Sequence, residues 1–388
     1  MTVNWQDMVK FLWCASRMCL RQEDIGYILD FVKRDVPWEN LIRLSVAEGV
    51  AGLLYHHLKK PEFVNLVPEP AIRDLEAIYV HTKKYCLAYL KEAEALSVRL
   101  EQAGIPVIVL QGLSLLTGFY KDPGLRPFGD ADLMVRPLHM QRLKQLLRKA
   151  GYELPVPEYP DLLYKGNICI DIHTHILNLD RIQNRRYLFP EDLTPMWEGA
   201  RPLFDPHHGL FVLDTCDNFV ALAAHALKHS YSHLIWLCDL HEGLLQLTGE
   251  PGGWGRVVEH TRFWKQERVV LYALLLIEAI FRLKVPETVK TALGIRRLGL
   301  FERHLIRLKI RGFSSSQLCT VLWLYSIRGG VDKLRFIGET IFPRREIMAQ
   351  ISRDNLQTQS RSIYLKRVLQ TIILAARDLQ RALGFSLS

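Results

Sequence analysis

The spacing of apolar residues predicts helices over the N-terminal part of the chain. Apolar positions recur every three or four residues in 41–58 and 71–103, which is the period of a helix with one buried face. The stretch 61–70, which begins and ends in proline, separates the two, and Gly104 closes the second as a C-terminal cap. Residues 1–104 are therefore expected to form a helical N-terminal region.

After Gly104 the pattern changes to the short, β-branched runs that are typical of buried strands. The expected elements, in chain order, are a strand at 105–110, a helix at 113–120, a strand at 130–135, a helix at 137–150 and a hairpin of strands at 162–164 and 168–175. The helical period returns from 215–230 onward, and tryptophans in these segments, Trp236 among them, are expected in the core because their neighbours are apolar. We therefore predict an α+β fold that is mostly helical, with a small mixed β-sheet core at 105–212 and a C-terminal helical region at 213–388.

Charge is distributed unevenly along the chain. The formal net charge is +9, yet residues 294–388 contain 17 Lys and Arg against 6 Asp and Glu, and the rest of the chain contains 33 against 35. A basic C-terminal region favours an anionic partner such as RNA, a nucleotide or an acidic protein. The alternative is an ordinary set of solvated basic helix faces, and the sequence leaves both open.

Cysteine usage and hydropathy indicate the compartment. The seven cysteines are scattered without a C-x-x-C pair, which argues against a disulfide framework or a zinc ribbon and favours a reducing cytoplasm. The N-terminal residues lack the pattern of a secretory signal. The longest apolar stretches, 269–277 and 318–327, are much shorter than the ~20 residues of a membrane-spanning helix. We expect a cytoplasmic protein with no membrane partner.

Two acidic residues on one expected strand suggest a metal site. Asp130 and Asp132 are two apart, so their side chains share a face of the strand, about 7 Å from each other. Adjacent carboxylates repel each other unless a cation lies between them. Mg²⁺, or Mn²⁺ in its place, suits such a site because it prefers oxygen ligands and substrate phosphates. Asp171, on the strand at 168–175, is expected to complete a site for one or two metal ions.

Residues before this strand offer a site for phosphate. Gly112 separates a strand from a helix, so phosphate can approach the backbone N–H groups at the helix start. Ser114 offers a hydroxyl group, and Arg126, four residues before Asp130, is placed to contact a triphosphate oxygen or to brace the loop. An Asp-x-Asp pair alone is a weak signal. The ordered series of strand, glycine, helix, arginine and then a strand with this pair is a much more specific one.

Several segments together resemble a known family. VIVLQGLSLLTGFYKDPGLRPFGDADLMV is similar to the core of the bacterial uncharacterised nucleotidyltransferases, a branch of the polymerase-β-like superfamily. IDIHTHI resembles that family's Asp-x-His strand, and DNFVALAAHALKHSYSHLIWLCDL resembles its His-x-x-x-His helix with the Trp and Asp that follow. The N-terminal helices and ETIFPRREIMAQ are also similar, so most of the chain is covered. The resemblance implies a nucleotidyltransferase α/β core with helical extensions, in which Gly112, Asp130, Asp132 and Asp171 take the phosphate- and metal-binding roles.

One position departs from the family's pattern. The usual lysine before the glycine is Gln111 here. A lysine would place a positive charge near substrate phosphate, whereas glutamine offers only a neutral donor. Gln111 leaves open weaker nucleotide binding, a different donor or a degenerate site, and the retained carboxylates argue against full degeneration.

Histidines form a further candidate group. His225 and His229 share a face of the helix at 215–230, and His173 and His175 share a strand face. Together with acidic residues such as Asp239 they offer ligands for zinc, but no H-E-x-x-H motif is present. We favour the interpretation that these histidines line a cleft and bond to carboxylates, with substrate binding or proton transfer as a hypothesis for His173, His225 and His229.

Three functional hypotheses follow from these features. The leading one is a metal-dependent nucleotidyltransferase that moves a nucleoside monophosphate from an NTP to an unknown acceptor (a small molecule, RNA or protein) and releases pyrophosphate. The second is a catalytically weak or inactive protein of the same fold that binds RNA or protein, motivated by Gln111 and the basic C-terminal region. The third is a zinc hydrolase built on the histidines.

Overall fold

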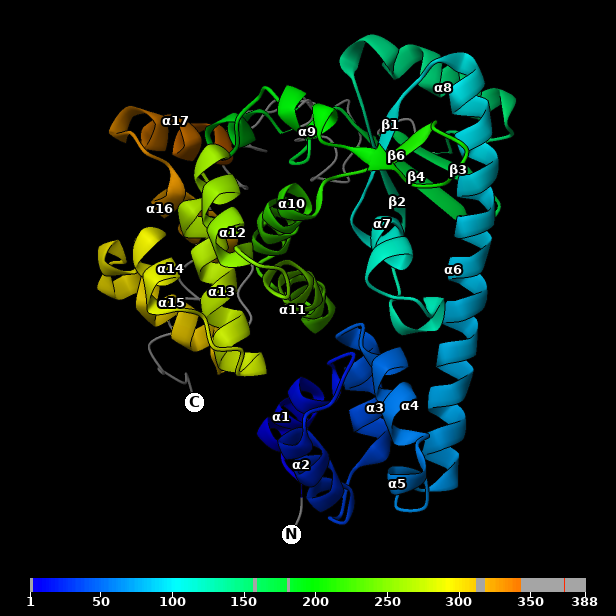
Figure 1. The fold of residues 1–388 in the computed structure, drawn as a ribbon, viewed down its shortest axis with the longest axis vertical. Coiled ribbons are helices and arrows are strands. Elements are labelled where there is room, and N and C mark those ends of the chain that lie inside the picture. The colour runs from blue at the N-terminus through cyan, green and yellow to red at the C-terminus, as the bar shows by residue number, and fades with distance from the viewer. Residues whose placement is uncertain (1–2, 156–158, 180–181, 312–317, 343–372, 374–388) are drawn as a thin grey trace.

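The computed structural model describes residues 3–155, 159–179, 182–311, 318–342 and 373. Three parts are visible in Figure 1: N-terminal helices, a mixed sheet and a C-terminal helical bundle. The long helix α6 (Glu69–Ala103) runs along one side of the molecule from the N-terminal helices to the sheet. Within the described residues, every helix is too short or too polar to span a bilayer.

The N-terminal part consists of short helices, of which the third and fourth pack against α6. They are α1 (Trp5–Ala15), α2 (Gln22–Val32), α3 (Trp38–Ala47), α4 (Ala51–Leu58) and α5 (Pro61–Val64). The helix expected at 41–58 is divided into α3 and α4 because Gly49 adopts a φ of +74°, which a right-handed helix cannot include. Gly104, with a φ of +62°, ends α6 in the left-handed conformation of a C-terminal cap.

The sheet has six strands in the order β3-β4-β2-β1-β6-β5. The strands are β1 (Val107–Leu110), β2 (Ala131–Val135), β3 (Leu162–Lys165), β4 (Ile168–His173), β5 (Arg201–Pro202) and β6 (Leu210–Val212). The pairs β1–β2, β3–β4 and β5–β6 are antiparallel, whereas β2–β4 and β1–β6 are parallel. The prediction of a mostly helical α+β fold with a small mixed sheet is confirmed.

The sequence did not reveal the last two strands. β5 has two residues and β6 has three, which is too short for an alternating pattern to stand out. β6 nevertheless pairs with β1 in the middle of the sheet, where Leu210 is fully buried. Its place is therefore set by contacts between distant segments and not by local sequence.

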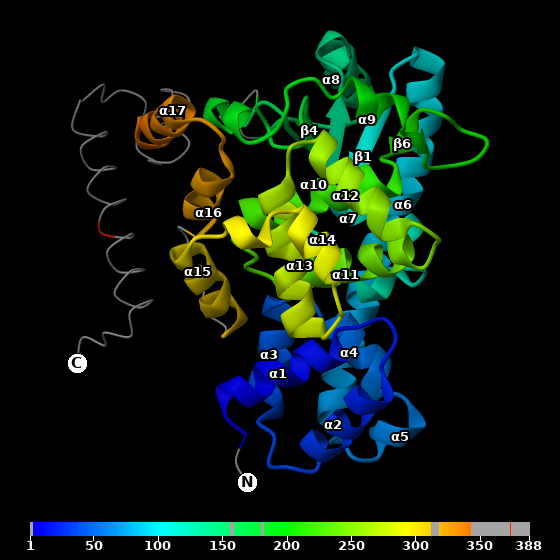
Figure 2. The same cartoon turned by 60° about the vertical axis from the view of Figure 1, so that its left-hand side comes forward.

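Helices surround the sheet and form the bundle beyond it. Beside the sheet lie α7 (Gln111–Gly118), α8 (Met140–Lys149) and α9 (Thr194–Glu198). The bundle comprises α10 (Thr215–Lys228), α11 (Leu234–Thr248), α12 (Gly253–Phe263), α13 (Glu267–Phe281), α14 (Glu287–Ala292), α15 (Leu300–Ile310), α16 (Leu318–Ser326) and α17 (Gly330–Ile341). Figures 1 and 2 both place α15, α16 and α17 on the side away from α6. Much of the expected basic C-terminal region, and most of ETIFPRREIMAQ, lies outside the described residues.

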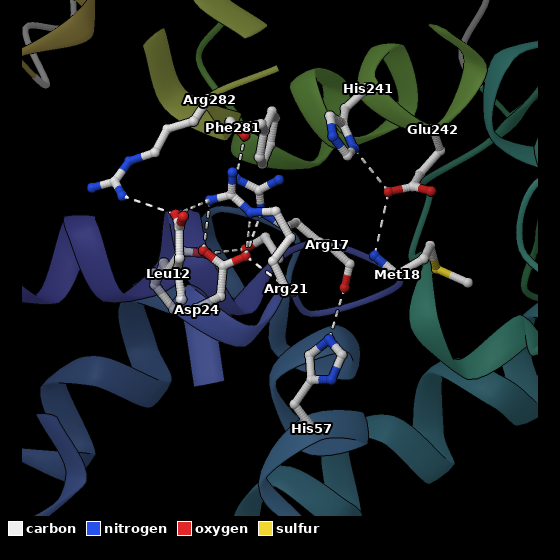
Figure 3. A network of polar contacts seen from close by, with 12 residues as sticks. Leu12, Arg17, Met18, Arg21, Asp24, His57, His241, Glu242, Phe281 and Arg282 are labelled. Carbon is white, nitrogen blue, oxygen red and sulfur yellow. Dashed lines mark hydrogen bonds and ion pairs between the residues drawn. The ribbon is translucent and has the colours of Figure 1, made fainter. Parts of the chain in front are cut away.

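A buried polar network joins the N-terminal helices to the bundle (Figure 3). Arg17, only 4% exposed, forms an ion pair with Asp24 and donates a hydrogen bond to the backbone carbonyl of Phe281 at the end of α13. The carbonyl of Arg17 lies 2.7 Å from Nε2 of His57 on α4. Since breaking a buried charge pair is costly, this network fixes the first and third parts of the chain to each other.

Candidate functional site

Strand pairing brings two of the three expected carboxylates together. β2 and β4 run parallel in a register that places Asp132 directly beside Asp171. One ligand oxygen of each, and one ring nitrogen of His173, lie within 4.8 Å of one another. Asp130 precedes the first residue of β2 and lines the cleft that Asp132 and Asp171 also line. The structure thus places all three carboxylates at one end of the central strands, with Asp132 and Asp171 nearest each other.

His173 supports Asp132 from the buried side. It is 2% exposed, and its Nε2 lies 2.6 Å from Asp132 Oδ1 and 3.6 Å from Asp171 Oδ2. Burial favours neutral forms of both partners, but their hydrogen bond and opposite charges outweigh it, so the pKa of His173 is raised and that of Asp132 is lowered. Asp132 is therefore held ionised, which is the state in which a carboxylate binds a cation.

Asp130 has the opposite electrostatic environment. Burial, and then the charges of Asp132 and Asp171, raise the pKa of Asp130 to about 6. Asp130 therefore ionises less readily than an ordinary aspartate until positive charge is added. A hard divalent cation with oxygen ligands is what this donor set fits.

The carboxylates open onto a cleft of about 520 Å³, a size that suits a small-molecule ligand. All three parts of the chain line it. The lining residues are Val46, Ala47 and Gly49 from the N-terminal part; Gln111, Gly112, Arg126, Pro127, Phe128, Gly129, Asp130, Asp132 and Asp171 from the sheet region; and His225, Lys228, His229, His233, Ile235 and Trp236 from α10, α11 and their connection. Carboxylates, aromatic rings and one lysine therefore face the same space.

The start of α7 forms one wall of this cleft. A side chain at Gly112 would meet Arg126 Nη1 at 2.5 Å and Phe128 Cβ at 2.6 Å, so close packing of the loop requires glycine here. Gln111 lines the cleft and adopts a φ of +52°, unusual for a residue with a side chain. The Ser114 hydroxyl donates to the Gln111 carbonyl at 2.7 Å, and Ser114 does not line the cleft.

Arg126 is held in a buried ion pair. Its Nη2 and Nε lie 2.7 and 3.3 Å from the two carboxylate oxygens of Asp239 on α11, and Nη1 donates to the Pro127 carbonyl at 3.2 Å. The Tyr120 hydroxyl also donates to Asp239, at 2.9 Å. Asp239 is 1% exposed and outside the cleft lining. Of the two roles expected for Arg126, this geometry favours bracing the loop that leads to Asp130.

The four histidines do not gather in one place. His173 contacts Asp132, whereas His175 Nε2 lies 2.9 Å from the Pro190 carbonyl. His225 and His229 line the cleft with ring centroids 4.6 Å apart, and burial lowers the pKa of each, to about 4 for His229. A zinc site built from all four is therefore wrong for this structure.

Lys228 and Trp236 are two of the cleft-lining residues that the sequence analysis did not assign to the site. Lys228, in the last turn of α10, is partly buried and makes no hydrogen bond or ion pair with the described residues. Burial and the nearby Arg185 lower the pKa of Lys228 to about 8. Trp236 was expected in the core but lines the cleft, with its ring centroid 4.7–5.3 Å from those of His225, His229 and His233. The three-residue spacing between His225 and Lys228 was a usable signal, since it places both on one helix face.

Comparison with known proteins agrees with the motif order. A family described as uncharacterised nucleotidyltransferase matches residues 34–282, which is more than half of the chain. The matched segment includes every cleft-lining residue. No curated protein and no solved structure matches the chain. The chain belongs to the uncharacterised nucleotidyltransferase family.

Proposed function

We propose that this protein transfers a nucleoside monophosphate from an NTP to an acceptor and releases pyrophosphate, with Mg²⁺ or Mn²⁺ held by Asp130, Asp132 and Asp171. The observation that carries the proposal is the placement of three carboxylates at one end of paired strands, open to a cleft of about 520 Å³. Family membership supports the reaction type. The acceptor class (small molecule, RNA or protein) is left to experiment.

The donor set fits a divalent metal ion. Asp132 is held ionised by His173. Burial, and then the charges of its acidic neighbours, raise the pKa of Asp130 to about 6, so a bound cation would stabilise its ionised form. When bound, the metal would neutralise triphosphate oxygens and polarise the reacting phosphate. Asp171 would in addition accept a hydrogen bond from the acceptor hydroxyl and help to remove its proton.

Lys228 supplies the cation on the opposite side of the cleft. Arg126 is bound to Asp239, and Gln111 is neutral, so Lys228 is the positively charged lining residue without a partner among the described residues. With a metal ion bound to the carboxylates, positive charge would lie on both sides of the cleft. An anionic ligand between the metal ion and the ammonium group would be attracted by both. We therefore assign Lys228, with the N–H groups at the start of α7 near Gln111 and Gly112, to the triphosphate. Ser114 and Arg126 fix the position of this part of the cleft through their hydrogen bonds to the Gln111 carbonyl and to Asp239.

The proposed chemical step is a substitution at the α-phosphorus of the NTP. An acceptor oxygen forms a bond to the α-phosphorus of the NTP, and the bond from that phosphorus to the α,β-bridging oxygen breaks. Pyrophosphate leaves with the electrons of the broken bond, next to Lys228, and the acceptor proton passes to Asp171 or to solvent. The Trp236 ring, with the His229 ring tilted by 40° and the His233 ring nearly perpendicular to it, gives this side of the cleft an aromatic surface on which a nucleobase or a planar acceptor could stack.

The experiment is incubation of the full chain with each of four α-labelled NTPs and Mg²⁺ or Mn²⁺, followed by separation of labelled products. We expect pyrophosphate release or label transfer with at least one NTP. This activity should be lost in Asp132→Asn and retained in Asp332→Asn, which changes a half-exposed carboxylate on α17. Absence of both nucleotide binding and transfer with every metal would refute the proposal.

The second candidate is a binding protein of the same fold with little or no activity. The neutral Gln111 in the cleft favours it, because the family's usual charge at this position is absent. Its distinguishing result is salt-sensitive RNA binding that Asp132→Asn leaves unchanged, since phosphate contacts made by basic residues elsewhere do not need the carboxylates.

A further inference from the structure

A second group of potential metal ligands lies at the other end of α10. Asp214 precedes this helix, Cys216 is in its first turn, and His260 is in the last turn of the neighbouring α12. One ligand atom of each lies within 4.8 Å of the other two. Cys216 and Lys228 are twelve residues apart on one helix, about 18 Å, so this group is separate from the cleft.

Hydrogen bonds prepare two of the three side chains for coordination. Asp214 accepts the Cys216 backbone N–H through Oδ1 at 2.8 Å, which leaves Oδ2 available. His260 Nδ1 lies 2.8 Å from Asp217 Oδ1, and because a carboxylate only accepts, Nδ1 must donate. The lone pair is then on Nε2. A carboxylate behind a histidine is the arrangement that orients imidazole ligands in protein metal sites.

The immediate surroundings keep this arrangement in place. Asp217 is 5% exposed and also accepts a hydrogen bond from Trp264 Nε1 at 2.7 Å, so it cannot turn away from His260. The Cys216 thiol is 4% exposed and has no hydrogen-bond partner among the described residues, whereas Asp214 and His260 are partly exposed. The group is therefore anchored on its buried side and reachable from solvent.

We propose that Asp214, Cys216 and His260 form a zinc site that fastens the start of α10 to the end of α12. A sulfur, an imidazole nitrogen and a carboxylate oxygen are ligands for Zn²⁺, whereas Mg²⁺ requires oxygen ligands. Zinc bonds are about 2.0–2.3 Å long, so ligand atoms in a tetrahedral site lie roughly 3–4 Å apart, and small side-chain rotations suffice. Water takes the fourth position. The site is independent of the proposed nucleotidyl transfer.

The test is metal content and cobalt spectroscopy on the full chain, purified without an affinity tag. We expect about one zinc ion per chain, and a sulfur-to-cobalt charge-transfer band after replacement of zinc by Co²⁺, because only a thiolate ligand produces that band. The carboxylate cluster at Asp132 contains no cysteine, so metal bound there cannot account for it. A wild-type chain that binds no zinc, or a cobalt form without this band, overturns the proposal.

Matched variants assign the ligands. The band should be lost in Cys216→Ser and in His260→Asn, and retained in Cys19→Ser, which removes an exposed thiol, and in Asp132→Asn. A band that survives in Cys216→Ser overturns the assignment. Circular dichroism of each variant checks the fold, and the wild-type spectrum decides the question even where a variant fails to fold.

Discussion

Replacing Lys228 with methionine tests the phosphate side of the cleft with two independent measurements. Methionine keeps much of the apolar length of the side chain and removes the ammonium group. A hydrogen bond to a charged group contributes about 1.5–3 kcal/mol, so losing one such contact should weaken NTP binding roughly 10- to 150-fold. The KM for the NTP, or its Kd in the absence of acceptor, measures this effect.

The same substitution should stabilise the protein without ligand. Burial and Arg185 lower the pKa of Lys228 from 10.5 to about 8, so its charged form is disfavoured in the folded chain. Discounted for its partial exposure, removing this charge should add ~1–3 kcal/mol to the free energy of unfolding at neutral pH. Between pH 8 and 10.5 the unfolded chain binds more protons at this residue than the folded chain, so the wild type gains stability as pH rises and its difference from Lys228→Met shrinks.

The matched control is Lys91→Met, at an exposed position on α6 that is not part of the cleft lining. We expect its KM and its Tm to stay close to those of the wild type. An unchanged KM in Lys228→Met would show that the ammonium group does not contact the triphosphate. A lower Tm across the whole pH range would show that its charge is compensated in the folded chain, contrary to the reasoning above.

Three further substitutions test the scaffold of the cleft. Gly112→Ala places a Cβ 2.5 Å from Arg126 Nη1, so it should lower the free energy of unfolding by about 1–3 kcal/mol and remove most of the NTP binding. Gly118→Ala, which has open space at its Cα, should change neither quantity. Thermal unfolding and NTP titration measure the two effects. Asp239→Ala leaves Arg126 buried without its carboxylate partner and should lower the free energy of unfolding, measured by chemical denaturation, by about 3–5 kcal/mol. Asp332→Ala, which removes a surface ion pair with an N–O distance of 3.7 Å, should lower it by less than about 1 kcal/mol. Equal effects would contradict the burial argument. His173→Gln should raise the Mg²⁺ concentration for half-maximal activity about 10- to 100-fold. His175→Gln should leave it unchanged, because the contacts of His175 are to the Pro190 carbonyl, the Leu177 backbone N–H and the Phe189 ring, and not to a carboxylate of the cleft.

The carboxylate side of the site was predictable because its geometry is local. The alternation of a strand puts residues two apart on one face, and this rule singled out Asp130 and Asp132 together, although β2 itself begins at Ala131. Asp171 was found in the same way, from a short apolar strand that could pair only within a small sheet. The parallel register beside Asp132 then follows from burying the apolar neighbours of both residues, such as Leu133 and Ile172.

The opposite wall was not predictable from the same rules. Trp236 lies in an apolar stretch, and apolar neighbours indicate a core position equally well for a buried ring and for a ring at the edge of a cleft. Val46 and Gly49 line the cleft only because the N-terminal helices fold back against α11, where the Ile235 backbone N–H donates to the Glu48 carbonyl at 3.0 Å. Contacts between segments nearly two hundred residues apart leave no periodic signal in the sequence.

Arg126 shows why residue type and motif position do not suffice to assign a role. A guanidinium four residues before Asp130 suits a phosphate as well as it suits a carboxylate. The choice depends on Asp239, which is more than a hundred residues away and reaches Arg126 only when α11 packs beside the sheet. Each of its three nitrogens already donates a hydrogen bond, two to Asp239 and one to the Pro127 carbonyl, so the Arg126 charge is already paired with a carboxylate. Lys228 has no such partner among the described residues, so under the proposed function the charge that meets the triphosphate comes from the helical bundle and not from the sheet region.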